Sequence, residues 1–168
     1  MNYATIKWTD IANGEGVRIS LFVSGCTRHC KDCFNAVAWD FNYGQPFDEE
    51  VQNKIFEGLK ADYIAGLSLL GGEPFEPENQ RALLPFVREA KKRFPDKTIW
   101  CYTGYRFEDL LAHPLRRKLV ELCDVIVDGR YNEAERDLSL HFRGSRNQRI
   151  INVAESLQGK VSWGESDD

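Results

Sequence analysis

The chain has 168 residues, of which 42% are hydrophobic and 29% are charged, and its formal net charge is −4. This length and composition predict one globular domain and exclude a disordered or fibrous chain. The negative charge disfavours a general nucleic-acid binder, because such proteins neutralise phosphates with a basic surface. The first ten residues lack the order of a signal peptide, and no run of about eighteen apolar residues occurs. We therefore expect a cytoplasmic protein without a membrane partner.

The N-terminal part predicts a hairpin-like start. Residues 1–16 are mixed in character and end in the turn signal Asn13-Gly14-Glu15-Gly16. The segment that follows, Val17–Val23, becomes apolar toward its end and predicts a buried strand.

Three cysteines, Cys26, Cys30 and Cys33, follow this strand with the spacing C-x3-C-x2-C. Thiolates are the ligands of iron–sulfur clusters, and three of them on one loop leave one iron of a four-iron cluster open to a second molecule. The alternative is a structural zinc site with His29 or another cysteine as fourth ligand, although zinc ligands usually come as two pairs and no second pair is present. The odd total of five cysteines, in a reducing compartment, disfavours disulfides.

The middle of the chain alternates between helical and strand patterns. Residues 48–60 predict an amphipathic helix with Asp48 as its N-cap. Residues 66–70 predict a central strand that leads into Gly71-Gly72-Glu73-Pro74. A helix is expected over residues 77–94, with Pro85 marking a kink or a late start, and a third strand over Thr98–Tyr102.

The pattern repeats once more before it weakens. A helical stretch over residues 107–123, broken at His113-Pro114, leads into a strand over Val125–Asp128. Residues 149–153 predict a last strand, so that the core spans about residues 10–153 and a polar, frayed tail spans residues 154–168. Strands that alternate with helices predict a parallel sheet, whose chemistry lies at the carboxyl ends of the strands.

The cysteine spacing together with Gly71-Gly72-Glu73-Pro74 resembles the radical S-adenosylmethionine (SAM) enzymes. Further segments resemble one family among them, the activating proteins of anaerobic ribonucleoside-triphosphate reductases. These segments lie between about residues 10 and 151, and they are Asn13–Gly16, Phe22–Cys26, Cys33–Asn35, Gly44–Phe47, Trp100–Tyr105, Val127–Gly129 and Arg143–Arg149. The chain departs from the family pattern at Asp32, where Gly or an aromatic residue is usual, and at Glu73, where close relatives often carry Asp.

The resemblance implies a fold and a set of site residues. The implied fold is α/β, an open partial (βα) barrel of about five mainly parallel strands with a gap for a large substrate. The implied metal site is a [4Fe-4S] cluster on Cys26, Cys30 and Cys33. The residues implied to bind SAM are Asp32, Cys33, Phe34, Gly71, Gly72, Glu73, Thr103 and Asp128, and none of them acts as a catalytic acid or base.

The resemblance also implies an activity. In this activity, the cluster passes one electron from an external donor to SAM. The resulting 5'-deoxyadenosyl radical takes a hydrogen atom from a glycine of the anaerobic ribonucleoside-triphosphate reductase. The cofactors supply this chemistry, and the protein orients and shields them. A homodimer within a hetero-oligomer with the reductase is a further expectation. The alternatives are an activase of another glycyl-radical enzyme and a non-enzymatic metal-binding module.

Other polar and sulfur-containing residues have simpler interpretations. Cys101 and Cys123 fit small buried hydrophobic positions. Arg143, Arg146 and Arg149 crowd an irregular segment, and we expect them to meet either the SAM carboxylate or the reductase.

Overall fold

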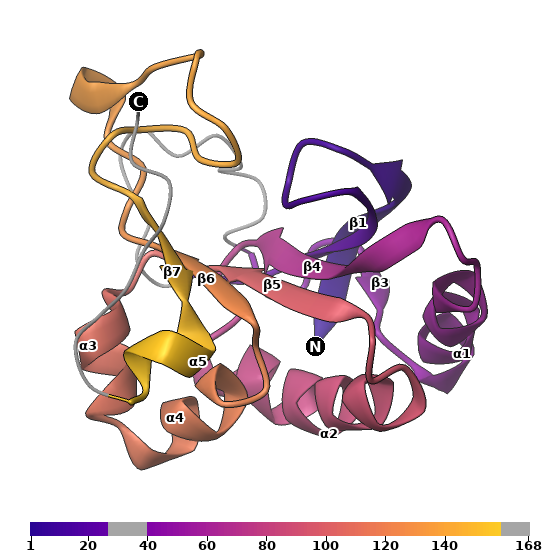
Figure 1. The fold of residues 1–168 in the computed structure, drawn as a ribbon. Helices are drawn as coiled ribbons and strands as arrows, with labels where there is room; N and C mark the ends of the chain where they lie inside the picture. Colours follow the sequence, from indigo (N-terminus) through magenta and orange to yellow (C-terminus); the bar gives the residue numbers. More distant parts are fainter. Residues whose placement is uncertain (27–39, 159–168) are drawn as a thin grey trace.

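A seven-stranded mixed sheet forms the body of the protein (Figure 1). The structure is a computed structural model, and it describes residues 1–26 and 40–158. The strands lie in the order β3-β1-β2-β4-β5-β6-β7. Their bounds are β1 Asn2–Asp10, β2 Val17–Val23, β3 Gln45–Pro46, β4 Ile64–Gly71, β5 Thr98–Tyr102, β6 Val125–Asp128 and β7 Arg149–Asn152.

The middle of the sheet is parallel, as predicted. Strands β2, β4, β5 and β6 run parallel to one another, whereas β1 and β7 pair antiparallel with β2 and β6, and β3 pairs antiparallel with β1. All five expected strands are present, but the sheet has two more, β1 and β3. The expected number of about five was therefore too low, because β1 is mostly polar and half-exposed and β3 has only two residues.

Helices cover one face of this sheet, on the lower side of Figure 1. Their bounds are α1 Glu49–Leu59, α2 Pro77–Arg93, α3 Phe107–Leu111, α4 Pro114–Val120 and α5 Val153–Ser156. The predicted N-cap of α1 is confirmed, because the Asp48 carboxylate accepts a bond from the Val51 N–H at 3.1 Å. The break at His113-Pro114 is also confirmed, since it separates α3 from α4.

Pro85 does not mark a late start of α2, which runs without a break from Pro77 to Arg93. Proline removes one backbone donor and leaves the carbonyl four residues earlier without its usual partner. Both Pro85 and Arg81 are exposed, so water can solvate that carbonyl. The proline is tolerated because it lies on the solvent side of the helix.

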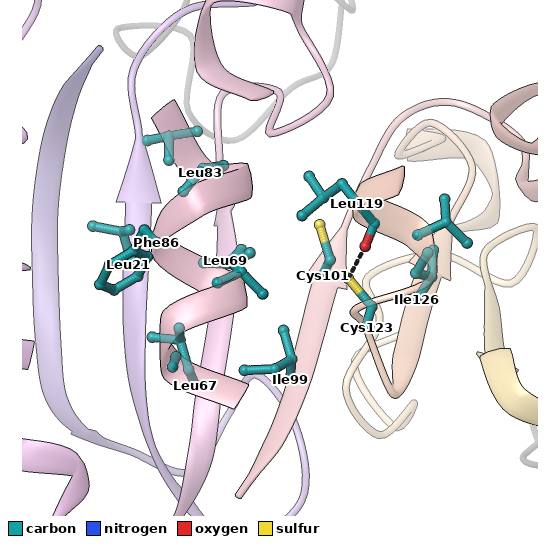
Figure 2. Close-up of a cluster of buried hydrophobic side chains, with 14 of the residues drawn as sticks. Leu21, Leu67, Leu69, Leu83, Phe86, Ile99, Cys101, Leu119, Cys123 and Ile126 are labelled. Atoms are coloured by element: carbon teal, nitrogen blue, oxygen red, sulfur yellow. Dashed lines mark hydrogen bonds between the residues drawn. The ribbon is translucent and has the colours of Figure 1, made fainter. Parts of the chain in front are cut away.

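The hydrophobic core lies between the sheet and the helices. Figure 2 shows Leu21, Leu69 and Cys101 of neighbouring strands facing Leu83 and Phe86 of α2. Cys101 and Cys123 are both buried in this layer, which confirms their interpretation as small hydrophobic residues. Because side chains alternate along a strand, Ser20, Phe22, Leu70 and Tyr102 point to the opposite face. Within the described residues, no helix combines the length and the apolar character needed to cross a membrane.

Candidate functional site

A cavity of about 410 Å³ opens on the helix-free face of the sheet, at the carboxyl ends of the parallel strands. We call it the strand-end cavity. Its floor comes from the ends of β2, β4 and β5, and one wall comes from the segment after β6. The lining residues are Ala12, Asn13, Phe22, Cys26, Leu70–Glu73, Tyr102–Gly104, Gly129–Tyr131, Leu140, Phe142–Gly144 and Gln148.

Cys26 lies at the edge of this cavity with its side chain buried. It follows Gly25, whose φ of +105° belongs to a region that side chains rarely adopt, and a Cβ there would lie 2.1 Å from the Phe41 ring. The structure therefore brings the first of the three predicted cluster ligands into the strand-end cavity. Four further predicted site residues, Cys30, Asp32, Cys33 and Phe34, lie outside the described residues.

The segment Gly71–Pro74, which we call the GGEP loop, is bonded to the start of the cysteine segment. The Gly72 N–H donates to the Val23 carbonyl at 2.8 Å, and the Glu73 N–H donates to the Gly25 carbonyl at 2.9 Å. The Asn79 amide of α2 donates to the carbonyls of Gly25 at 3.3 Å and Glu73 at 3.0 Å. The two motifs, which lie more than forty residues apart in the sequence, thus form one bonded unit.

Glu73 and Thr103, which were predicted separately, are direct partners. The buried Glu73 carboxylate accepts bonds from the Thr103 hydroxyl at 2.7 Å, the Gly104 N–H at 2.8 Å and the Phe75 N–H at 3.1 Å. These bonds connect the end of β4 to the end of β5. The geometry supports a role for Glu73 in holding these loops in place.

Asp128 does not line the strand-end cavity. Its buried carboxylate accepts a bond from the Phe107 N–H at 2.8 Å, at the first residue of α3, and one from the Arg149 Nε at 3.1 Å. Arg149 also donates to Glu108 at 2.7 Å, and this pairing lowers the pKa of Glu108 to about 2. Asp128 therefore fastens α3 and β7 to the end of β6, while its neighbour Gly129 reaches the cavity.

We call residues 143–149 the arginine turn. Its three arginines lie in three different surroundings. Arg149 is bonded to Asp128 and Glu108 as described above. Arg146 lies on the surface and pairs with Asp137 at 2.8 Å. Arg143 is buried, with 7% of its surface exposed, and lines the strand-end cavity. Their equal spacing in the sequence gave no sign of this difference.

Arg18 supports the site from outside the cavity lining, and the sequence analysis missed it. It is fully buried on the helix-free face of β2 and donates to the Ser68 hydroxyl at 2.8 Å, to the Thr98 carbonyl at 2.7 Å and to the Glu15 carbonyl at 2.9 Å. Burial lowers the pKa of its guanidinium to about 10. The bond to Glu15 holds the turn after β1 against the sheet, and the Ser68 hydroxyl donates to the Asn13 carbonyl of the same turn at 2.6 Å. The sequence did contain a signal for this buried charge, because Arg18 lies between the apolar residues Val17 and Ile19 in a predicted buried strand.

The chain is similar to proteins of one named family. The family model described as "4Fe-4S single cluster domain" matches residues 12–151. The anaerobic ribonucleoside-triphosphate reductase-activating protein of Pasteurella multocida is 46% identical over 152 residues, which cover 89% of this chain and 96% of the relative. Proteins of the same name from Haemophilus influenzae and Escherichia coli are 44% and 40% identical, with 89% of this chain and 97% of each relative covered.

The chain belongs to the family of anaerobic ribonucleoside-triphosphate reductase-activating proteins. The matched length includes every element that forms the strand-end cavity, from the turn before β2 to β7. A relative from Enterobacteria phage T4 carries the same name at 39% identity, with 93% of its length covered. The resemblance expected from the motifs is thus confirmed.

Proposed function

We propose that the chain is an activase that cleaves SAM reductively on a [4Fe-4S] cluster and generates a glycyl radical on an anaerobic ribonucleoside-triphosphate reductase. The observation that carries this proposal is the bonded unit of Val23–Cys26 and the GGEP loop at the floor of the strand-end cavity. It joins the thiol that is predicted to bind the cluster to a glycine loop beside a space of small-molecule size. The names of the relatives supply the target.

The donor chemistry at Cys26 suits a cluster. Thiolate sulfur is the ligand type that iron–sulfur clusters use, and the Cys26 side chain lies at the cavity edge rather than in the core. We propose that Cys30 and Cys33 complete the ligand set, which the description of the matched family supports. When bound, the cluster supplies one electron, taken from an external donor, that breaks a carbon–sulfur bond of SAM and so provides the radical that takes a glycine hydrogen.

The strand-end cavity suits SAM in size and lining. Its volume of about 410 Å³ lies within the range of small-ligand sites, and apolar Phe22 and Leu70 lie beside polar main-chain groups. Gly71 and Gly72 carry no Cβ, so their main chain can approach the methionyl amine of a ligand. We propose that Thr103 and Gly104, which are held by Glu73, lie beside the ribose of SAM. We assign Asp32, Cys33 and Phe34 to the adenine and Asp128 to the support of this wall.

We propose that the reductase reaches the cavity along its helix-free side. The sheet is open in the described residues, because its terminal strands β3 and β7 do not pair with each other. An open sheet of this kind suits a protein substrate, which must insert a glycine-bearing segment. A homodimer within a hetero-oligomer with the reductase remains part of the proposal.

The test is 5'-deoxyadenosine formation by anaerobically reconstituted protein that is given SAM and a strong reductant. We expect product from the parent chain, and from Cys26→Ala we expect neither product nor four bound irons. The matched control is Cys101→Ala, which removes a buried cysteine outside the cavity and should retain both iron and product.

Each rival function has its own outcome. A chain that binds metal but forms no product, even with the reductase present, would be a metal-binding module and would contradict the proposal. Product without any activation of the reductase would indicate an activase of another glycyl-radical enzyme.

A further inference from the structure

We propose that Arg143 recognises the carboxylate of SAM and selects for it, an inference that rests on the proposed function. The sequence left three arginines as equal candidates for this role. The structure separates them by position, because Arg143 lies in the cavity wall, whereas Arg146 lies on the surface and Arg149 lies beside Asp128, outside the cavity lining.

The arginine turn is built to hold Arg143 in this wall. The Gln148 side chain accepts bonds from the Gly144 N–H at 2.9 Å and the Ser145 N–H at 3.1 Å, and it donates to the Gly129 carbonyl at 3.1 Å. Next to Arg143, the Phe142 carbonyl accepts a bond from the Tyr102 hydroxyl at 2.6 Å. The backbone on both sides of Arg143 is therefore tied to the ends of β5 and β6.

The guanidinium itself is positioned in advance. Its Nη1 donates to the carbonyls of Gln148 at 2.6 Å and Arg146 at 3.2 Å. A guanidinium has five N–H donors, so bonds to the main chain and recognition of a ligand are compatible. Because the side chain is already ordered and buried, binding a carboxylate costs little additional side-chain entropy.

The charges around the strand-end cavity favour an anionic group at Arg143. Three of the described lining residues carry a charge, namely Glu73, Arg130 and Arg143. The Glu73 carboxylate is directed at Thr103 and Gly104, and Arg130 is exposed at the rim. Arg143 is thus the buried cation of this wall, and guanidinium–carboxylate bonds are among the strong charge-assisted ones.

The proposal is tested by a double-mutant cycle in which the second change is made in the ligand. Anaerobically reconstituted parent and Arg143→Gln proteins are titrated with SAM and with decarboxylated SAM, and dissociation constants are measured by calorimetry. We expect Arg143→Gln to weaken SAM binding roughly 10-fold or more and to leave binding of the decarboxylated analogue nearly unchanged. Any contribution of the SAM carboxylate that does not involve Arg143 is the same in both proteins, so it cancels from the coupling free energy that the cycle measures.

Two further variants separate recognition from folding. Arg146→Gln makes the same change in the same turn outside the cavity, so both ligands should bind as they do to the parent. Arg143→Lys keeps the positive charge but lacks the planar guanidinium that can donate two parallel bonds to a carboxylate. We therefore expect a smaller loss of SAM binding than in Arg143→Gln. If thermal melting shows that Arg143→Gln is unfolded, the cycle is run with Arg143→Lys.

The possible results test the role of Arg143 separately from the proposed function. Equal weakening of both ligands, or no weakening of either, would overturn the role of Arg143 and leave the proposed function standing. A parent protein that carries four irons and binds neither ligand would instead contradict the proposed function.

Discussion

Buried charged residues hold the walls of the strand-end cavity in place. Among the described residues, Arg18 donates to uncharged acceptors, which include Ser68 of β4 and Thr98 of β5. Glu73 accepts bonds from the loop after β5. Buried charges are costly unless they are fully hydrogen-bonded, so each residue stabilises the site only while its partners remain.

We therefore expect Glu73→Gln to destabilise the protein. The amide replaces one carboxylate oxygen with a donor, which would face either the Gly104 N–H or the Phe75 N–H and leave that buried donor without an acceptor. The expected loss in the free energy of unfolding is about 1–3 kcal/mol, measured by chemical denaturation. Glu78→Gln, at an exposed position in the first turn of α2, is the matched control. Equal stability of the two variants would contradict this role.

The sequence predicted these residues singly but not their pairing. Glu73 and Thr103 were recognised at the ends of two strands, and the structure brings them into contact. Asp128 also lies at the end of a strand, but its partner Arg149 comes from an antiparallel strand whose direction the apolar pattern does not encode. The position of Arg143 was not predictable either, because it depends on how the arginine turn folds against Gly129.

At the scale of elements, the ends of β2 and β4 form the joint on which the site depends. Gly71 has a φ of +112°, and a Cβ there would lie 2.5 Å from the Val23 carbonyl oxygen. The two strands can therefore end side by side only if this residue is glycine. Because a neighbouring backbone cannot move away cheaply, the close approach adds to the conformational strain of any substitution.

A pair of glycine substitutions tests this joint. Gly129 has a similar φ of +98°, but a Cβ there would have no neighbour closer than 3.6 Å. We expect Gly129→Ala to cost about 1–3 kcal/mol in the free energy of unfolding and Gly71→Ala to cost roughly 1–3 kcal/mol more. Thermal and denaturant unfolding of the two variants measure the difference. A cost at Gly71 no larger than at Gly129 would show that the clash is relieved.

The elements that the sequence predicted well are those with strong apolar patterns. The bounds of β2, β5 and β6 agree with the predicted strands, since these are short apolar runs flanked by polar turns. Strand β1 was expected only as part of a hairpin-like start, because none of its first eight residues is fully buried. Its pairing with β2 depends on tertiary contacts that leave no regular alternation in the sequence.

At the scale of the whole molecule, chemistry and support are divided between the two faces of one sheet. The helices and the larger hydrophobic cluster occupy one face (Figures 1 and 2), and the strand-end cavity occupies the other, beside a smaller cluster of Trp100, Val127 and Ile150. A protein substrate can approach the cavity face without displacing the core. This division suits an activase, whose target must be bound and then released.

The most direct test of the central claim follows a hydrogen atom. Reductase labelled with deuterated glycine is incubated with the reconstituted chain, SAM and reductant, and the mass of the 5'-deoxyadenosine is measured. We predict that the product gains deuterium only when the labelled reductase is present, while a glycyl radical forms on the reductase. Product that forms with the labelled reductase and carries no deuterium would contradict the claim that the chain takes a hydrogen atom from a reductase glycine.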